Sequence, residues 1–92
     1  MEYSIGQIVY SKSGRDKNLP FIVISVEGDY LYLADGELRK LEQPKRKKIK
    51  HVQGTNYVNI ELKEKLETGS YIQNAELVKV LKQYNRNDSV TN

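Results

Sequence analysis

Three short runs rich in β-branched and aromatic residues follow one another closely near the start of the sequence. They span residues 7–11, 21–26 and 30–34, and glycine, aspartate and asparagine occupy the segments between them. Runs of this kind form strands, and the intervening residue types form tight turns. Short strands at such close spacing predict a small β-barrel. The chain has 92 residues and a mass of 10.7 kDa, which is the size of one small domain.

The second and third runs differ in pattern, and the difference indicates where each strand lies. Residues 21–26 are apolar on both faces, as expected for a central strand whose two faces contact different neighbours. Residues 30–34 alternate, so that Tyr30 and Tyr32 share one face and the two leucines share the other. We expect the leucine face to lie in the core.

Two further strands are expected after the turn signal at residues 35–36. Residues 37–41 are predicted to form a short fourth strand, and residues 47–52 a fifth. The lysines of the fifth strand place it at a sheet edge, because charged edges discourage the addition of another strand.

The second half of the sequence predicts two short helices. Asn59 is a candidate N-cap for the first helix, and Gly69 stands just beyond its end. Glu61 and Lys65 are spaced as an i, i+4 ion pair on this helix. Neither helix is long enough to be stable alone, so each should dock on the barrel or on the other helix.

The second helix is expected over residues 74–85, with Asn74 as its N-cap and a polar tail after it. We interpret the pair as a helical hairpin used for packing rather than a DNA-reading helix-turn-helix. An apolar stripe on the second helix consists of Leu77, Leu81 and Tyr84.

The predicted fold class is therefore mainly β, with a five-stranded small barrel over residues 1–54 and a pair of α-helices within residues 55–92.

Several residue types and patterns are absent from the sequence. It has no cysteine, which excludes disulfides, thiolate nucleophiles and cysteine-ligated zinc. No apolar run approaches the roughly 20 residues of a membrane helix, and the first residues lack the basic and apolar regions of a signal peptide. We therefore expect a cytoplasmic protein that does not associate with membranes, and we favour a monomer.

Candidate catalytic residues are few. His51 is the sole histidine, and it follows a cationic tract with no nearby acid to orient it. One histidine and scattered carboxylates do not supply a metal site. Residues 13–17 place a glycine beside basic residues but lack the spacing of a nucleotide-binding P-loop. We expect no catalysis, no cofactor and no metal.

The charge is distributed very unevenly along the chain. The net charge is only +3, but residues 45–51 hold five basic side chains and no acidic one, whereas residues 1–44 hold five basic and seven acidic. Like charges in such a run repel one another, and nucleic-acid phosphates relieve the repulsion and release counterions. The alternative is a solvated edge kept soluble by lysines, and composition leaves both interpretations open.

Other residues could extend this surface. Residues 12–17 contain three basic side chains, and they would form one patch with residues 39–50 if the barrel brings the two segments together. Tyrosines exposed beside such a patch could stack on unpaired bases. The alternative is that Tyr30 and Tyr32 complete a second small core under the helices.

Residues 5–26 resemble the KOW motif, in which an apolar strand, a basic loop with a key glycine and a second apolar strand follow in order. Gly14 matches the motif glycine. Together with residues 32–51, this segment resembles small bacterial KOW-domain RNA-binding proteins, which are similar to KOW-type large-subunit ribosomal proteins of archaea and eukaryotes. One departure is Asn18, where the family commonly has glycine; asparagine tolerates a left-handed backbone better than other non-glycine residues.

The resemblance implies an SH3-like five-stranded barrel that binds RNA without catalysis, with ribosomal RNA of the large subunit as the expected partner. Lys and Arg side chains would contact phosphates, and the loop glycine would allow close backbone approach. A second hypothesis is a protein-interaction adapter that uses the barrel groove or the amphipathic helix. The RNA-binding positions carried over from the family are Lys12, Gly14, Arg15, Lys17, Arg39, Lys40, Lys45, Arg46, Lys47, Lys48 and Lys50.

Overall fold

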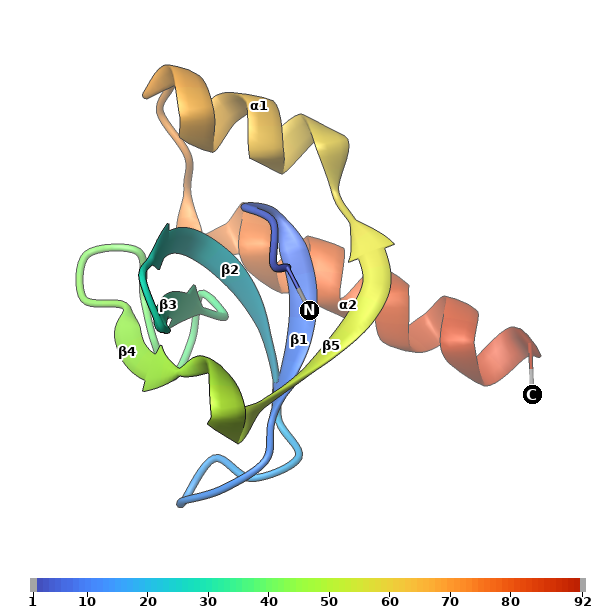
Figure 1. Ribbon diagram of the computed structural model, residues 1–92. Helices are drawn as coiled ribbons and strands as arrows, with labels where there is room; N and C mark the ends of the chain where they lie inside the picture. Colours follow the sequence, from blue (N-terminus) through green and yellow to red (C-terminus); the bar gives the residue numbers. More distant parts are fainter. Residues whose placement is uncertain (1, 92) are drawn as a thin grey trace.

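The computed structural model describes residues 2–91, with side chains for residues 2–85. Within these residues the chain forms five strands, one 3-10 turn and two α-helices (Figure 1). In chain order they are β1 (Gln7–Ser11), β2 (Pro20–Glu27), β3 (Tyr30–Ala34), β4 (Lys45–Lys48), η1 (Ile49–His51), β5 (Val52–Val58), α1 (Ile60–Thr68) and α2 (Asn74–Thr91).

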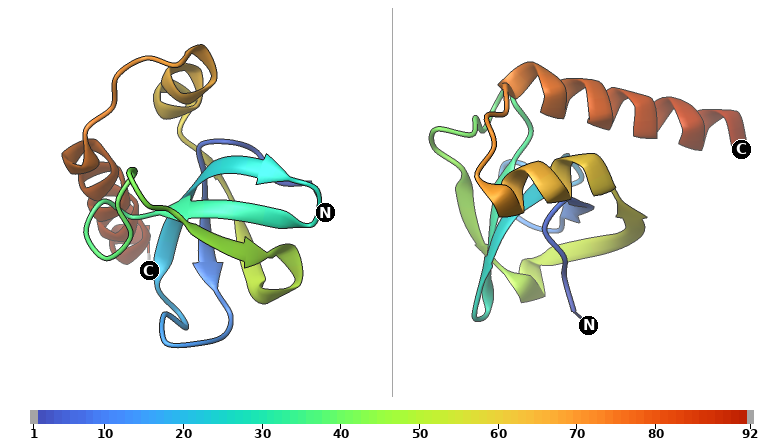
Figure 2. Two further views of the ribbon diagram at one scale, coloured as in Figure 1. Left: turned by 90° about the vertical axis from the view of Figure 1, so that its left-hand side faces the viewer. Right: turned by 90° about the horizontal axis from the view of Figure 1, so that it is seen from above.

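The five strands form one antiparallel sheet in the order β4-β3-β2-β1-β5. The sheet is strongly curved, and η1 joins its two edge strands, β4 and β5 (Figures 1 and 2). This arrangement confirms the predicted fold class, a small barrel-like sheet followed by two helices. The central position predicted for residues 21–26 is also confirmed, since β2 is the middle strand.

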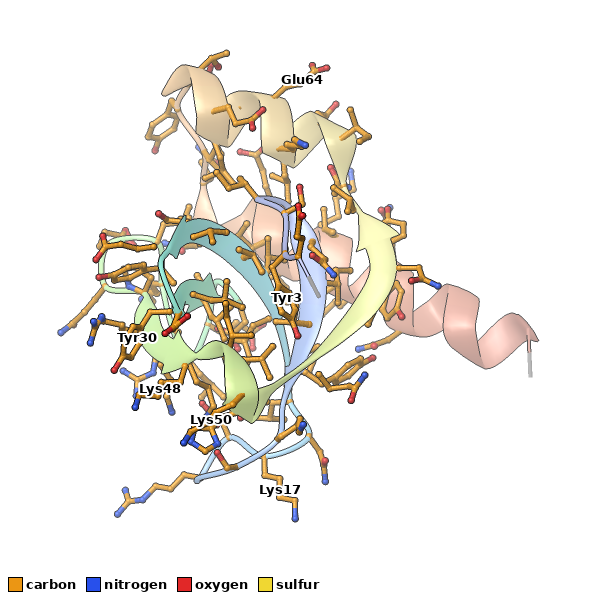
Figure 3. The ribbon with its side chains drawn as sticks, in the orientation of Figure 1. Tyr3, Lys17, Tyr30, Lys48, Lys50 and Glu64 are labelled. Carbon is orange, nitrogen blue, oxygen red and sulfur yellow. The ribbon has the colours of Figure 1, made fainter. Side chains whose placement is uncertain are left out.

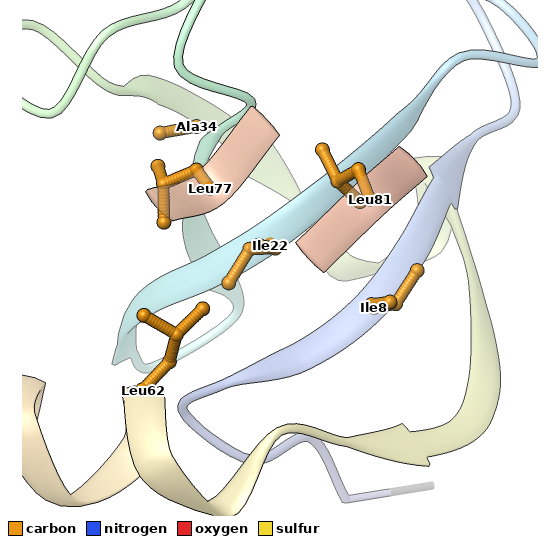
Figure 4. Close-up of a cluster of buried hydrophobic side chains, with 6 residues drawn as sticks. All are labelled: Ile8, Ile22, Ala34, Leu62, Leu77 and Leu81. Atoms are coloured by element: carbon orange, nitrogen blue, oxygen red, sulfur yellow. The ribbon is translucent and has the colours of Figure 1, made fainter. Parts of the chain in front are cut away.

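Each face of the sheet carries its own hydrophobic core. On one face, Phe21 and Val23 of β2 pack with both leucines of β3, as predicted for the leucine face. On the opposite face, Ile22 packs with Ile8 and Ala34 beneath the two helices (Figure 4). The two faces of β2 therefore contact different neighbours, which is why this strand is apolar on both faces. The helices contribute Leu62, Leu77 and Leu81 to the second core.

Helix α1 begins and ends where the sequence predicts. The Asn59 side chain accepts a hydrogen bond from the Leu62 amide (2.9 Å), and Gly69 terminates the helix in the left-handed conformation with φ 73°. The ion pair of this helix differs from the prediction. Lys65 Nζ lies 2.8 Å from a carboxylate oxygen of Glu76 on α2, so that the pair links the two helices.

Helix α2 begins at the predicted residue but is capped differently. The Asn74 side chain turns away from its own helix and accepts a hydrogen bond from the Leu41 amide (2.8 Å). The carboxylate of Glu76 instead accepts a hydrogen bond from the Gln73 amide (2.8 Å), which satisfies an unpaired donor at the start of the helix. The backbone stays helical to Thr91, past the predicted end near residue 85.

The strand predicted over residues 37–41 is wrong. This segment lies in a loop, in which one carboxylate oxygen of Asp35 accepts hydrogen bonds from the amides of Glu37 (3.0 Å) and Arg39 (2.8 Å). These local bonds replace a β-ladder. The strand predicted over residues 47–52 is also wrong, because this segment is divided: its first two residues end β4, residues 49–51 form η1, and Val52 begins β5. The fourth strand is therefore β4, and the last strand, β5, extends to Val58 and so passes the predicted barrel boundary at residue 54.

Among the residues that the structure describes, neither helix combines the length and apolar character needed to cross a lipid bilayer.

Candidate nucleic-acid interface

The first loop, residues 12–19, folds back against the end of the barrel. The Lys17 amide donates to the Gly14 carbonyl (3.2 Å), and the Asn18 amide donates to the Ser11 carbonyl (2.8 Å). Gly14 has φ 84° and Asn18 has φ 71°, so both adopt the left-handed backbone that most residues avoid. Asn18 therefore adopts a conformation that glycine takes most readily and that asparagine tolerates.

Asp16 is the residue that fastens this loop to the sheet. Its side chain is buried and accepts hydrogen bonds from Ser11 Oγ (2.6 Å), Lys45 Nζ (2.6 Å) and Lys47 Nζ (3.1 Å). Lys47 Nζ also donates to the Ser13 carbonyl (2.9 Å). Two lysines of β4 thus converge on one carboxylate of a loop some thirty residues earlier in the chain.

The charge of Asp16 is stabilised by these partners. Burial by itself would raise the pKa of the Asp16 carboxyl, but the hydrogen bonds from Lys45, Ser11 and Lys47 outweigh that effect. The pKa of this carboxyl therefore lies well below its usual range, and Asp16 is ionised across the physiological range.

This ion-pair cluster places the first loop beside β4, which is the adjacency that a continuous basic patch needs. It also divides the predicted RNA-binding residues into two groups. Lys47 is buried, and its side chain is only 8% exposed, while that of Lys45 is 24% exposed. Both lysines bind Asp16, so their role in the fold is structural.

The other predicted cations are open to solvent. Figure 3 shows Lys17, Lys48 and Lys50 at one end of the molecule, with Glu64 of α1 at the opposite end. The exposed cations come from the first loop, the loop at residues 35–44, β4 and η1. They are Lys12, Arg15, Lys17, Arg39, Lys40, Arg46, Lys48 and Lys50.

The loop at residues 35–44 also lies beside the first loop. A shallow groove of about 320 Å³ between them is lined by Arg15, Arg39 and Lys45, with Asp16 at its wall. Arg39 therefore adjoins the surface of the first loop. Lys40 is exposed beside Glu42 in the same loop.

A second group of side chains occupies the outer face of the β3–β4 ribbon. In the register of the two strands, Tyr30 lies opposite Lys48 and Tyr32 lies opposite Arg46. Opposed residues share a face, so two tyrosines and two cations stand together there. The guanidinium carbon of Arg46 lies 3.5 Å from the centroid of the Tyr30 ring. These tyrosines belong to neither hydrophobic cluster of the described residues, so they do not complete the core under the helices.

Two features of this region were not anticipated from the sequence. One is the binding of Asp16 to β4; the hint that the sequence offers is that Asp16 is the single acidic residue within the otherwise basic segment 12–17. The other is the stacking of Arg46 on Tyr30, which depends on the register of strands whose turn is ten residues long. Residues so far apart cannot be paired without knowing that register.

No cluster of three or more His, Cys, Asp or Glu side chains within the described part of the chain is arranged to hold a metal ion. The sequence matches no protein-family model and no curated protein to which it was compared.

Proposed function

We propose that this protein is a non-catalytic RNA-binding protein of the cytoplasm, associated with the ribosome through ribosomal RNA. The observation that supports this function best is the packing of the first loop on β4 through Asp16, Lys45 and Lys47. It places the exposed cations of the first loop beside those of β4, and Arg39 of the loop at residues 35–44 adjoins them across a shallow groove. The resemblance of residues 5–53 to KOW-domain RNA-binding proteins supports the same proposal.

The electrostatics of this surface favour a polyanionic partner. Exposed like charges held close together repel one another in the free protein. Phosphates of RNA neutralise them and release condensed counterions, which gives strong and salt-dependent affinity. Contacts to phosphates position the protein without reading the base sequence. The loop at Gly14 brings its backbone to the same surface, since Gly14 is exposed.

The adapter hypothesis loses its main surface, the apolar stripe of α2. Leu77 is fully buried and Leu81 is 6% exposed, because both pack on Ile8 and Ile22 of the sheet. The apolar stripe of α2 therefore already has a partner within the chain.

Co-sedimentation with bacterial ribosomes across a salt series tests the proposal. We expect the protein to sediment with ribosomes at low salt and to be released as the salt concentration rises. The double variant Lys12→Glu/Lys17→Glu should sediment less, whereas Lys79→Glu/Lys82→Glu on α2 carries the same change in net charge and should sediment like the wild type. Sedimentation that is absent at low salt, or that does not respond to salt, contradicts the proposal.

Charge reversal across all of β4 is not a suitable test. Replacing Lys45 and Lys47 by glutamate would place two carboxylates against the buried Asp16 and release the first loop. The informative substitutions are confined to the exposed cations.

A further inference from the structure

The outer face of the β3–β4 ribbon ends in a groove at the start of η1. The groove has a volume of about 630 Å³, and it is lined by Asp29, Tyr30, Lys48, Ile49 and Lys50. This volume lies within the range of pockets that hold small organic ligands. Its walls combine an aromatic ring and an aliphatic side chain with two ammonium groups.

The groove is held in shape by the backbone. The Ile49 amide donates to the Asp29 carbonyl (2.8 Å), which fixes the start of η1 against the turn between β2 and β3. Tyr30 and Lys48 are direct cross-strand partners in the β3–β4 ladder. Ile49 packs on the core that contains Leu31 and Phe21. The walls therefore come from rigid elements rather than from a free loop.

The Tyr30 side chain lines the groove and already takes part in one stacking contact. Its phenol is half-buried, and the Arg46 guanidinium lies over the ring at 3.5 Å. Lys48 Nζ lies 5.9 Å from the ring centroid. A tyrosine ring with cations close by is suited to stack against an aromatic base. The phosphate attached to that base can then bind a nearby ammonium group.

We propose that this groove binds one unpaired nucleotide of the RNA, with its base stacked against Tyr30 and Ile49 and its phosphate at Lys48 and Lys50. The carboxylate of Asp29 at the groove can accept a hydrogen bond from the amino group of a base. Paired bases cannot enter, because their faces are covered by neighbours in the helix. The inference rests on the proposed RNA-binding function and adds that the protein prefers single-stranded segments such as loops or bulges.

The test compares two probes, an oligocytidine RNA and a blunt-ended RNA duplex of the same length, in equilibrium titrations with the full chain. Tyr30→Ala should weaken binding of the single strand about tenfold, as expected for the loss of one base–aromatic stack, and leave binding of the duplex unchanged. Tyr30→Phe keeps the ring and should bind the single strand within about twofold of wild type. The matched control is Tyr71→Ala, since Tyr71 is 82% exposed and lies between the two helices.

A second measurement uses the wild-type protein and so does not depend on how Tyr30 variants fold. An abasic RNA strand of the same length keeps every phosphate but has no bases, and it should bind about tenfold more weakly than oligocytidine. Equal affinity for the abasic and normal strands overturns the inference, as does an equal loss of single-strand and duplex binding in Tyr30→Ala. If the wild type binds duplex but shows neither effect, the inference fails while the proposed function stands. If the wild type binds neither RNA, the proposed function itself fails.

Discussion

Lys47 Nζ lies 3.1 Å from Asp16 Oδ1, and both side chains are almost fully buried at the end of the barrel. The contact joins β4 to the first loop across 31 positions of sequence. It holds the first loop and β4, which are both basic, side by side, and it neutralises the buried ammonium group of Lys47. The exposed cations of both segments are left facing solvent, which is the arrangement on which the proposed function depends.

Asp16→Asn should destabilise the protein substantially. The substitution removes the negative charge that two lysine ammonium groups share, and it leaves Lys47 buried without an ionic partner. We expect the free energy of unfolding in urea to fall by about 2–3 kcal/mol. The control is Asp29→Asn in an exposed turn, which should change it by less than about 0.5 kcal/mol. Equal effects of the two substitutions would show that the Asp16 cluster does not hold the loop.

The same carboxylate should make stability depend on pH in the acidic range. The pKa of Asp16 is lower in the folded protein than the value of about 3.9 for an unfolded chain. The unfolded state therefore binds more protons in this range, so the contribution of Asp16 is fully present above about pH 5 and is lost progressively as the pH falls. Urea denaturation of the wild type and Asp16→Asn between about pH 6 and pH 2 measures this effect. The two curves should converge toward low pH; a constant gap between them contradicts the assignment.

Gly36 is required where the loop at residues 35–44 meets α2. It has φ 85°, and a Cβ atom there would collide with the Asn74 carbonyl oxygen and lie 3.0 Å from Val78 Cγ2. Gly28 also has a positive φ (58°), but a Cβ atom there would meet open space. Gly28→Ala should cost about 1 kcal/mol from backbone strain alone, and Gly36→Ala at least about 1 kcal/mol more. Thermal or urea unfolding distinguishes them, and similar values for both would contradict the close packing of this loop on α2.

The salt dependence of RNA binding reports how many phosphates are contacted. If about five phosphates are neutralised, the slope of log K against log salt concentration should be about −3.5 to −4.5. Lys48→Gln/Lys50→Gln removes two cations and should make that slope shallower by about 1.4 to 1.8. A double variant with the wild-type slope would show that these lysines do not contact phosphates.

Much of the fold could be predicted from local patterns. The alternation of residues 30–34 indicated which face of β3 is buried, and Asn59 and Gly69 marked the ends of α1. These features depend on residues a few positions apart. The strand expected over residues 37–41 was wrong because the Asp35 side chain bonds the backbone of its own loop, and such local bonds compete with a ladder.

The candidate site was only partly predictable. The cluster of cations followed from the sequence, but its proximity to the first loop was only a condition for a continuous patch, and the division into exposed and buried lysines was not predicted. Alternate residues of β4 face opposite sides, and which pair faces inward is set by the register with β3. The sequence also gives no indication that Arg46 covers the ring of Tyr30, since that contact depends on the same register.

The central claim is that the exposed cations beside the first loop bind RNA. The most direct measurement is an equilibrium titration of a ribosomal RNA fragment with wild type, Lys48→Glu/Lys50→Glu and Lys79→Glu/Lys82→Glu at one low salt concentration. The two double variants change the net charge equally but at different sites. The claim predicts that the first variant loses most of its affinity and the second keeps the wild-type value. Equal losses in both variants would show that only total charge matters, and undetectable binding by the wild type would contradict the claim outright.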